Sequence, residues 1–139
     1  MSSETNIRWG WLKGMYICTI IAAGGSGFGL IFAPGSLKTI FKIPSQDPII
    51  VGILGGIYVS FAFLSILGLR SPLKFSPILL LQLGYKVIWF VGVMLPALVT
   101  RSLPSYAIPF VVVFAAFIVG DLIAIPFKYL FRKEDAAIQ

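Results

Sequence analysis

Four long, continuously apolar stretches divide the chain, and prolines or glycines fall at or near their ends. A helix needs about 20 residues to cross a hydrocarbon core of about 30 Å, and each stretch is long enough to do so. The stretches run from Leu12 to Phe32, from Ile49 to Leu69, from Ile78 to Val99 and from Tyr106 to Phe131. This pattern predicts an all-α fold, a bundle of four transmembrane helices that forms a single domain over residues 1–139.

Prolines and one short connector modify the predicted helices. Pro96 and Pro126 lie inside the third and fourth stretches, where each should kink or end the helix near the preceding turn. Between the first two stretches, the segment from Pro34 to Pro48 mixes apolar residues with Lys38 and Lys42. This mixture predicts a short amphipathic helix on the outer surface, which either connects two spans or acts as a gate over a cavity.

Composition and charge support the membrane assignment. The chain has 139 residues, of which 58% are hydrophobic and only 12% charged, so it has too little polar surface for a soluble globule of this size. Lys and Arg favour the side of the N-terminus, the second loop and the C-terminus, with Arg8, Lys13, Arg70, Lys74, Lys128, Arg132 and Lys133 against Lys38, Lys42 and Arg101. Both termini are therefore predicted to be cytoplasmic. The dispersed net charge of +6 favours contact with the headgroups of membrane lipids and argues against binding to nucleic acid.

Redox and metal chemistry have little support in the residues. The chain has no histidine, and its single cysteine, Cys18, lies within the first span. We therefore expect no metal site and no disulfide within the chain. No spacing of acid and base residues calls for catalysis, so an enzyme is not predicted, and no cofactor can be named.

Two charges, Lys86 and Asp121, lie deep inside apolar stretches. If Ser76 marks the cytoplasmic entry of the third span and Phe131 the exit of the fourth, the helical rise places each charge roughly 15 Å from that face. An isolated charge at this depth costs at least about 2.5–3.5 kcal/mol. We therefore expect Lys86 and Asp121 to satisfy each other, either as a structural pair or as part of a functional site.

The third span carries a polar face around this predicted pair. Gln82, Tyr85, Lys86 and Trp89 follow one another at helical spacing, so an amide, a phenol, an ammonium and an indole share one side of the helix. Aromatic rings beside the ammonium would stabilise it by cation–π attraction. Counting along the first two spans adds three candidates at a similar depth, namely Thr19, Tyr58 and Ser60.

Pairs of glycines at four-residue spacing predict close helix contacts. These pairs are Gly10 with Gly14, Gly25 with Gly29 and Gly52 with Gly56. Such spacing allows helix backbones to approach in a membrane, either within the chain or between copies in a homo-oligomer. The glycines of the first span also permit local unwinding around a ligand, which requires that the backbone line a cavity.

The chain resembles the DoxX-like small bacterial four-helix membrane proteins. The resemblance rests on Phe32-Ala33-Pro34 through Ile43-Pro44, on the run from Gly52 to Gly56 and on the run from Gln82 to Lys86. It implies a four-helix bundle in the bacterial inner membrane. Some members of that group are linked to quinone or thiol redox systems and others to the assembly of partner membrane proteins. No catalytic motif carries over residue by residue.

Three functional hypotheses follow. The first is a mid-membrane cavity at Lys86 and Asp121 that binds a small lipid-soluble or anionic molecule. The second is a scaffold or assembly factor for another membrane protein, with a closed Lys86–Asp121 bridge and exposed small-residue stripes. The third is a small dimeric transporter, which is disfavoured because Lys86 beside Asp121 would hinder a proton-coupled cycle.

Overall fold

A computed structural model describes residues 7–133 and confirms the all-α fold; residues 1–6 and 134–139 of the predicted single domain lie outside the described part. Four helical segments are long and apolar enough to cross a membrane. The first two are α1 (Trp9–Phe32) and α3 (Pro48–Arg70). The third combines α4 (Pro77–Trp89), the π-helix η2 (Phe90–Met94) and α5 (Leu95–Val99), and the fourth combines η3 (Ser105–Ala107) with α6 (Ile108–Ala124). Two short helices, α2 (Pro34–Phe41) and α7 (Phe127–Leu130), complete the part of the chain that the structure describes.

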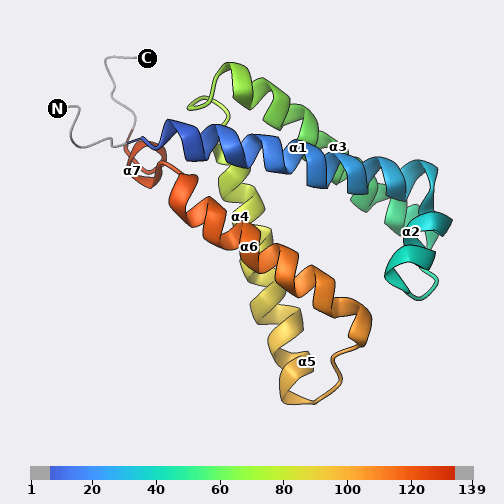
Figure 1. Cartoon of the computed structure of the whole chain (residues 1–139). Coiled ribbons are helices and arrows are strands. Elements are labelled where there is room, and N and C mark those ends of the chain that lie inside the picture. Colours follow the sequence, from blue (N-terminus) through green and yellow to red (C-terminus); the bar gives the residue numbers. More distant parts are fainter. Residues whose placement is uncertain (1–6, 134–139) are drawn as a thin grey trace.

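The four spans form two pairs that diverge from a common end (Figure 1). One pair is α1 with α3, which lie side by side along much of their length. The other pair is α4 with α6, and α6 also contacts α1. The pairs meet where α1 begins and α7 ends, and they separate toward α2 and α5 (Figure 1). The bundle is therefore closed at one end and splayed at the other.

The closed end holds the hydrophobic core. Its fully or nearly buried side chains come from α1, α4 and the end of the fourth span, and they are Leu12, Met15, Tyr16, Leu79, Leu83, Ala124 and Ile125. Tyr16 is fully buried, and its hydroxyl donates a 2.6 Å hydrogen bond to the carbonyl of Pro72 in the loop after α3. This bond ties α1 to the turn between the second and third spans.

Glycines bring α1 and α3 together, although not the predicted pairs. Gly27 packs against the backbone of Gly55, and Gly68 lies under the ring of Tyr16. A side chain at any of these three positions would meet atoms at 2.8 Å or closer. By contrast, the predicted glycine pairs mostly face open space; only Gly29 has a close neighbour, Leu37 of α2. As contacts within the chain, the predicted pairs are therefore wrong, whereas a contact between copies stays a prediction.

Proline explains the irregular third span. Pro96 has no N–H group and its ring crowds the preceding turn. Directly before it, the chain widens into the π-helix η2, in which the N–H of Leu95 bonds to the carbonyl of Phe90. The predicted distortion in the turn before Pro96 is thus confirmed.

The fourth span is shorter than predicted. Its helix ends at Ala124, because Pro126 cannot continue it, and the separate helix α7 follows. The helix predicted to continue to Phe131 therefore ends about two turns earlier. This error changes the depth assigned to Asp121, which lies in the last turn of α6.

The connector after α1 is a short helix, as predicted. α2 begins at Pro34 and ends at Phe41, and the next residue, Lys42, has a φ of 55° in the left-handed region. Asp47 then caps α3, because its carboxylate accepts hydrogen bonds from the N–H groups of Ile49 and Ile50. Phe41 of α2 packs against Phe110 of α6 at a ring distance of 5.6 Å, so α2 reaches across the splayed end.

Candidate functional site

A chain of buried polar side chains links α1, α4 and α6. The hydroxyl of Thr19 lies 3.0 Å from Oε1 of Gln82, and Nε2 of Gln82 donates to the carboxylate of Asp121 at 3.2 Å. All three side chains are almost inaccessible, with 1%, 2% and 0% of their surfaces exposed. The Thr19 hydroxyl also lies 2.8 Å from the carbonyl of Met15, so its single proton is shared between two acceptors. The arrangement orients the Asp121 carboxylate and fixes three helices relative to one another.

Lys86 lies in a different environment, which is largely aromatic. Its side chain is 3% exposed, and the ammonium donates one hydrogen bond of 2.9 Å to the hydroxyl of Tyr85. The ammonium also lies over three rings, those of Tyr85, Phe117 and Phe114, at 4.3, 4.9 and 5.2 Å from their centroids. The predicted cation–π contact is present, and it involves two rings of α6 in addition to Tyr85.

The predicted direct pair between Lys86 and Asp121 is absent. Within residues 7–133, no carboxylate oxygen lies within 4.0 Å of the Lys86 ammonium. The reason is the early end of the fourth span, because counting from Phe131 assigned Asp121 too great a depth. In the structure Asp121 is level with Gln82, which is four residues and about 6 Å before Lys86 on α4.

The other predicted site residues divide into two groups. Tyr58 and Trp89 belong to the aromatic surroundings of Lys86. The ring centroids of Tyr58 and Tyr85 are 6.4 Å apart, and those of Trp89 and Phe114 are 5.0 Å apart. Ser60 lies outside the cluster, because it is exposed and its hydroxyl donates to the carbonyl of Gly56 in its own helix.

Sequence reasoning missed the aromatic residues of the fourth span. Phe110, Phe114, Phe117 and Asp121 follow one another at spacings of four, three and four residues, which places them on one face of α6. The same helical spacing predicts the polar face of the third span, so the sequence also indicates this aromatic face of α6. Ser65 of α3 was also missed; it is fully buried, and its hydroxyl has no hydrogen-bond partner within the described chain.

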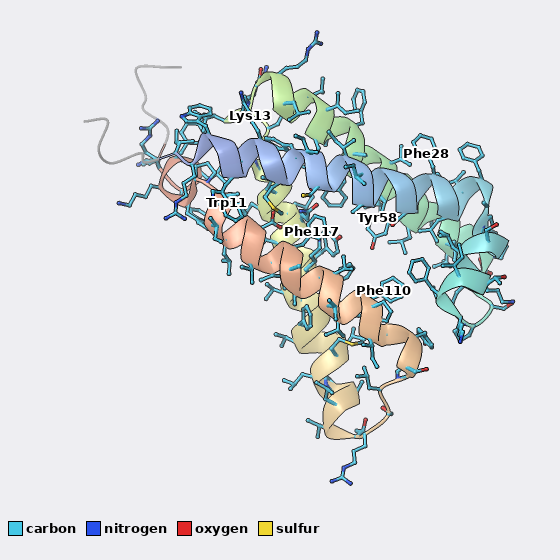
Figure 2. The ribbon with its side chains drawn as sticks, in the orientation of Figure 1. Trp11, Lys13, Phe28, Tyr58, Phe110 and Phe117 are labelled. Atoms are coloured by element: carbon cyan, nitrogen blue, oxygen red, sulfur yellow. The ribbon has the colours of Figure 1, made fainter. Side chains whose placement is uncertain are left out.

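Aromatic side chains continue from Lys86 toward the splayed end. Phe114 packs edge-to-face on Tyr85 and on Phe110, and Phe110 meets Phe41 of α2. Figure 2 shows Tyr58 and Phe110 on the sides of the two helix pairs that face each other. An aromatic wall thus leads from the buried ammonium to the outer end.

Two shallow, open hollows of the described chain lie away from Lys86. One is a shallow surface on α2 at Gly35 and Thr39, and the other lies beside Lys74 at the start of the third span. Lys86 itself is enclosed by side chains, so the predicted open mid-membrane cavity is not seen at this position. In residues 7–133, no three His, Cys, Asp or Glu side chains gather where they could hold a metal ion.

These features define a small multi-pass membrane protein of four apolar helices with two buried charges of different surroundings. No family model, no curated protein and no solved structure matches the chain.

Proposed function

We propose that the protein binds a small lipid-soluble or anionic molecule whose charged or carbonyl head accepts a hydrogen bond from Lys86. The observation that carries the proposal is a buried ammonium with one oxygen acceptor, the Tyr85 hydroxyl, and no carboxylate within 4.0 Å in residues 7–133. An ammonium has three N–H donors, so two remain for an incoming acceptor.

The surroundings of Lys86 suit recognition better than helix pairing. A buried cation that served only to fix helices would be expected beside the available carboxylate, yet Asp121 is held by Gln82 instead. The rings of Tyr85, Phe114 and Phe117 stabilise the charge without occupying its donors. An anionic or carbonyl oxygen of a ligand would complete the hydrogen bonding.

The aromatic wall supplies an apolar surface for the rest of the ligand. The wall begins at Phe114 beside Lys86 and continues to Phe110. Two further rings extend it, because Trp89 packs on Phe114 and Tyr58 packs on Tyr85. Since side chains enclose Lys86, entry requires that the two helix pairs separate or that rings rotate. The Phe41–Phe110 contact is the outermost point of this route, which supports the role of α2 as a gate.

A binding assay with matched probes tests this proposal. The purified protein in mild detergent is titrated with oleate, with methyl oleate and with a short-chain quinone, and binding is followed by tryptophan fluorescence. Lys86→Met should weaken binding of the preferred probe about tenfold or more, because a charge-assisted hydrogen bond is lost. The control Lys13→Met alters an exposed lysine of α1 and should leave binding unchanged.

The probes also separate the two ligand classes. Preference for oleate over its methyl ester supports an anionic head, whereas equal binding of the ester and the quinone supports a carbonyl head. Equal affinity of the wild type and Lys86→Met for every probe would refute the proposal.

A homo-oligomer is a second proposal, supported by one surface. Gly52 and Gly56 lie one turn apart on α3, and an added side-chain atom at either would meet nothing within 4 Å. This is the small-residue surface that close contact with a second membrane helix requires. If copies associate there, Gly56→Leu should shift the protein to monomers in detergent ultracentrifugation, and an unchanged mass would exclude this contact. Roles as an assembly factor or a dimeric transporter stay predictions.

We also propose that the protein lies in a bacterial inner membrane with both termini cytoplasmic, as the DoxX-like resemblance and the basic residues suggest. In support, the start of α1 and the end of α7 lie at the same end of the bundle (Figure 1). A C-terminal fusion to green fluorescent protein should fluoresce, whereas a C-terminal fusion to alkaline phosphatase should be inactive. The opposite result would reverse the topology.

A further inference from the structure

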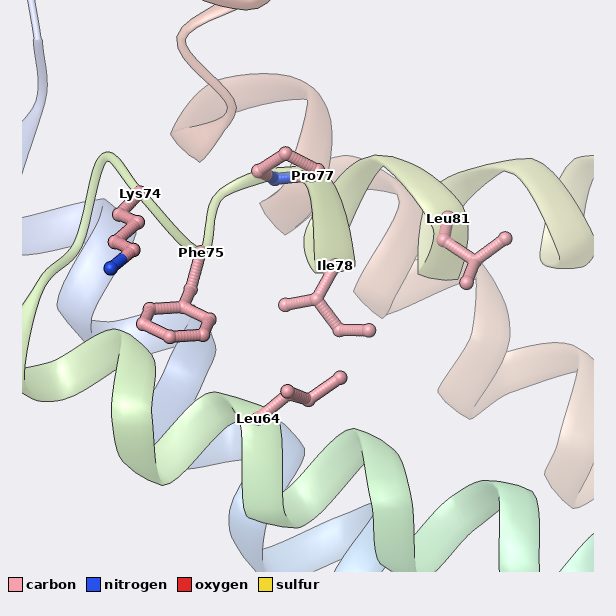
Figure 3. A pocket seen from close by; sticks show the side chains of 6 residues that line it. All are labelled: Leu64, Lys74, Phe75, Pro77, Ile78 and Leu81. Carbon is pink, nitrogen blue, oxygen red and sulfur yellow. The ribbon is translucent and has the colours of Figure 1, made fainter.

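A second candidate site lies at the closed end of the bundle, where the chain passes from α3 to α4. It is a shallow groove of about 250 Å³, largely open to the surroundings, and it is lined by Leu64, Lys74, Phe75, Pro77, Ile78 and Leu81 (Figure 3). None of these residues contributes to the surroundings of Lys86. The groove is therefore independent of the proposed function above.

The groove extends from the expected membrane surface into the hydrocarbon region. Lys74 lies in the loop between the end of α3 at Arg70 and the start of α4 at Pro77. Leu64 is six residues before Arg70, about 9 Å along the helix, and Leu81 is four residues after Pro77, about 6 Å along it. The charged end of the groove thus lies at headgroup depth and its apolar end at the depth of acyl chains.

The chemistry of the lining changes along the same direction. Lys74 is exposed and is the one charged residue of the groove, and its ammonium lies 5.9 Å from the centroid of the Phe75 ring. The remaining lining is apolar, with Leu64 and Ile78 half-buried and Leu81 open to the lipid side. A cation at the water end and apolar side chains below it match the charge and the orientation of an anionic phospholipid.

We propose that this groove is a binding site for one anionic phospholipid. The phosphate lies at Lys74, and the part of an acyl chain nearest the headgroup lies along Leu64, Ile78 and Leu81. A transmembrane helix of another protein fits less well, because the groove is short and ends at a charged residue. The site differs from general attraction of a basic surface to lipid, since it requires both the ammonium and the apolar groove.

Native mass spectrometry from lipid bilayers tests the proposal. The full-length protein is placed in nanodiscs that contain equal amounts of palmitoyl-oleoyl phosphatidylglycerol and phosphatidylcholine, and the lipids that remain bound are counted. The wild type should retain more phosphatidylglycerol than phosphatidylcholine. Lys74→Gln should lower this preference about fivefold, because the contact between its ammonium and the lipid phosphate in the groove is lost. Lys128→Gln removes an exposed lysine of α7 that does not line the groove, so it should change the preference less than twofold.

A second pair of variants tests the apolar half of the site. Leu81→Trp should fill the groove and reduce retention of both lipids, whereas Leu122→Trp, at a similarly exposed position of α6, should not. The proposal is overturned if the wild type shows no preference for phosphatidylglycerol. It is also overturned if Lys128→Gln loses as much preference as Lys74→Gln, or if Leu81→Trp retains both lipids.

Discussion

Asp121 and Lys86 are two buried charges on different helices, and their surroundings are opposite. Asp121 is level with Gln82, one helical turn before Lys86 on α4. Asp121 accepts hydrogen bonds from Gln82, which in turn meets Thr19, so polar groups of three helices satisfy one another. Lys86 has one hydrogen bond and three aromatic rings. Asp121 lies next to the packed core, whereas ring contacts continue from Lys86 through Phe114 and Phe110 to Phe41 of α2.

This difference separates a structural polar group from a candidate recognition group. A buried polar group whose partners all come from the protein can hold helices in register. A buried cation whose remaining donors face rings has unused hydrogen-bonding capacity, which a ligand can use. Depth in the membrane alone did not distinguish the two residues; their neighbours did.

The largest expected effect comes from breaking the polar chain at its centre. Gln82→Leu removes the donor to Asp121 and leaves a carboxylate buried without a partner. The free energy of unfolding should therefore fall by about 3 kcal/mol. The measurement is the free energy of unfolding in mixed detergent micelles. The double variant with Gln82→Leu and Asp121→Leu should recover part of this loss, because no charge remains buried. A single variant within about 0.5 kcal/mol of the wild type would contradict the structural role.

Close packing at the closed end should show the next largest effect. Gly68→Ala places a methyl group 2.5 Å from the ring of Tyr16, which is itself fully buried. The free energy of unfolding should therefore fall by about 2 kcal/mol. Gly84→Ala, in the interior of α4 but facing open space, should be neutral or slightly stabilising. The same unfolding assay compares the two. Equal effects would mean that the Tyr16 contact is not tight in the protein.

Removal of the Thr19 hydroxyl tests the outer end of the polar chain. Thr19→Val keeps the shape of the side chain but leaves Oε1 of Gln82 without this donor, at a cost of about 1–2 kcal/mol. Thr39→Val changes an exposed threonine of α2 that donates only to the carbonyl of Gly35, so it should cost less than about 0.5 kcal/mol. If both substitutions cost the same, the Thr19–Gln82 contact contributes nothing specific.

The smallest expected effect concerns the two charges themselves. A double-mutant cycle with Lys86→Met and Asp121→Asn should give an interaction energy of about 1 kcal/mol or less, because no direct ion pair joins them. The cycle with Gln82→Leu and Asp121→Asn should give a larger coupling. A stronger coupling for Lys86 than for Gln82 would restore the direct pair predicted from helix counting.

The sequence predicted much of the local structure. Continuous apolar runs of about 20 residues specify membrane helices, because every backbone polar group must be bonded within the helix in lipid. Prolines set the local breaks, because each removes a backbone N–H donor. Pro96, in the first turn of α5, follows the π-helix, and Pro126 follows the end of α6. The polar face of Gln82, Tyr85 and Lys86 was also evident, because periodicity within one helix depends on sequence alone.

What the sequence by itself determined, therefore, is the number of spans, their helical character and which residues share a face. Only the tertiary structure decided that Asp121 meets Gln82 instead of Lys86, that Ser60 faces outward and that Gly27, Gly55 and Gly68 make the close contacts. These outcomes depend on the register and rotation of one helix against another. A shift of a single turn, about 5.4 Å, exchanges one buried partner for the next, and no pattern within a single helix specifies that shift.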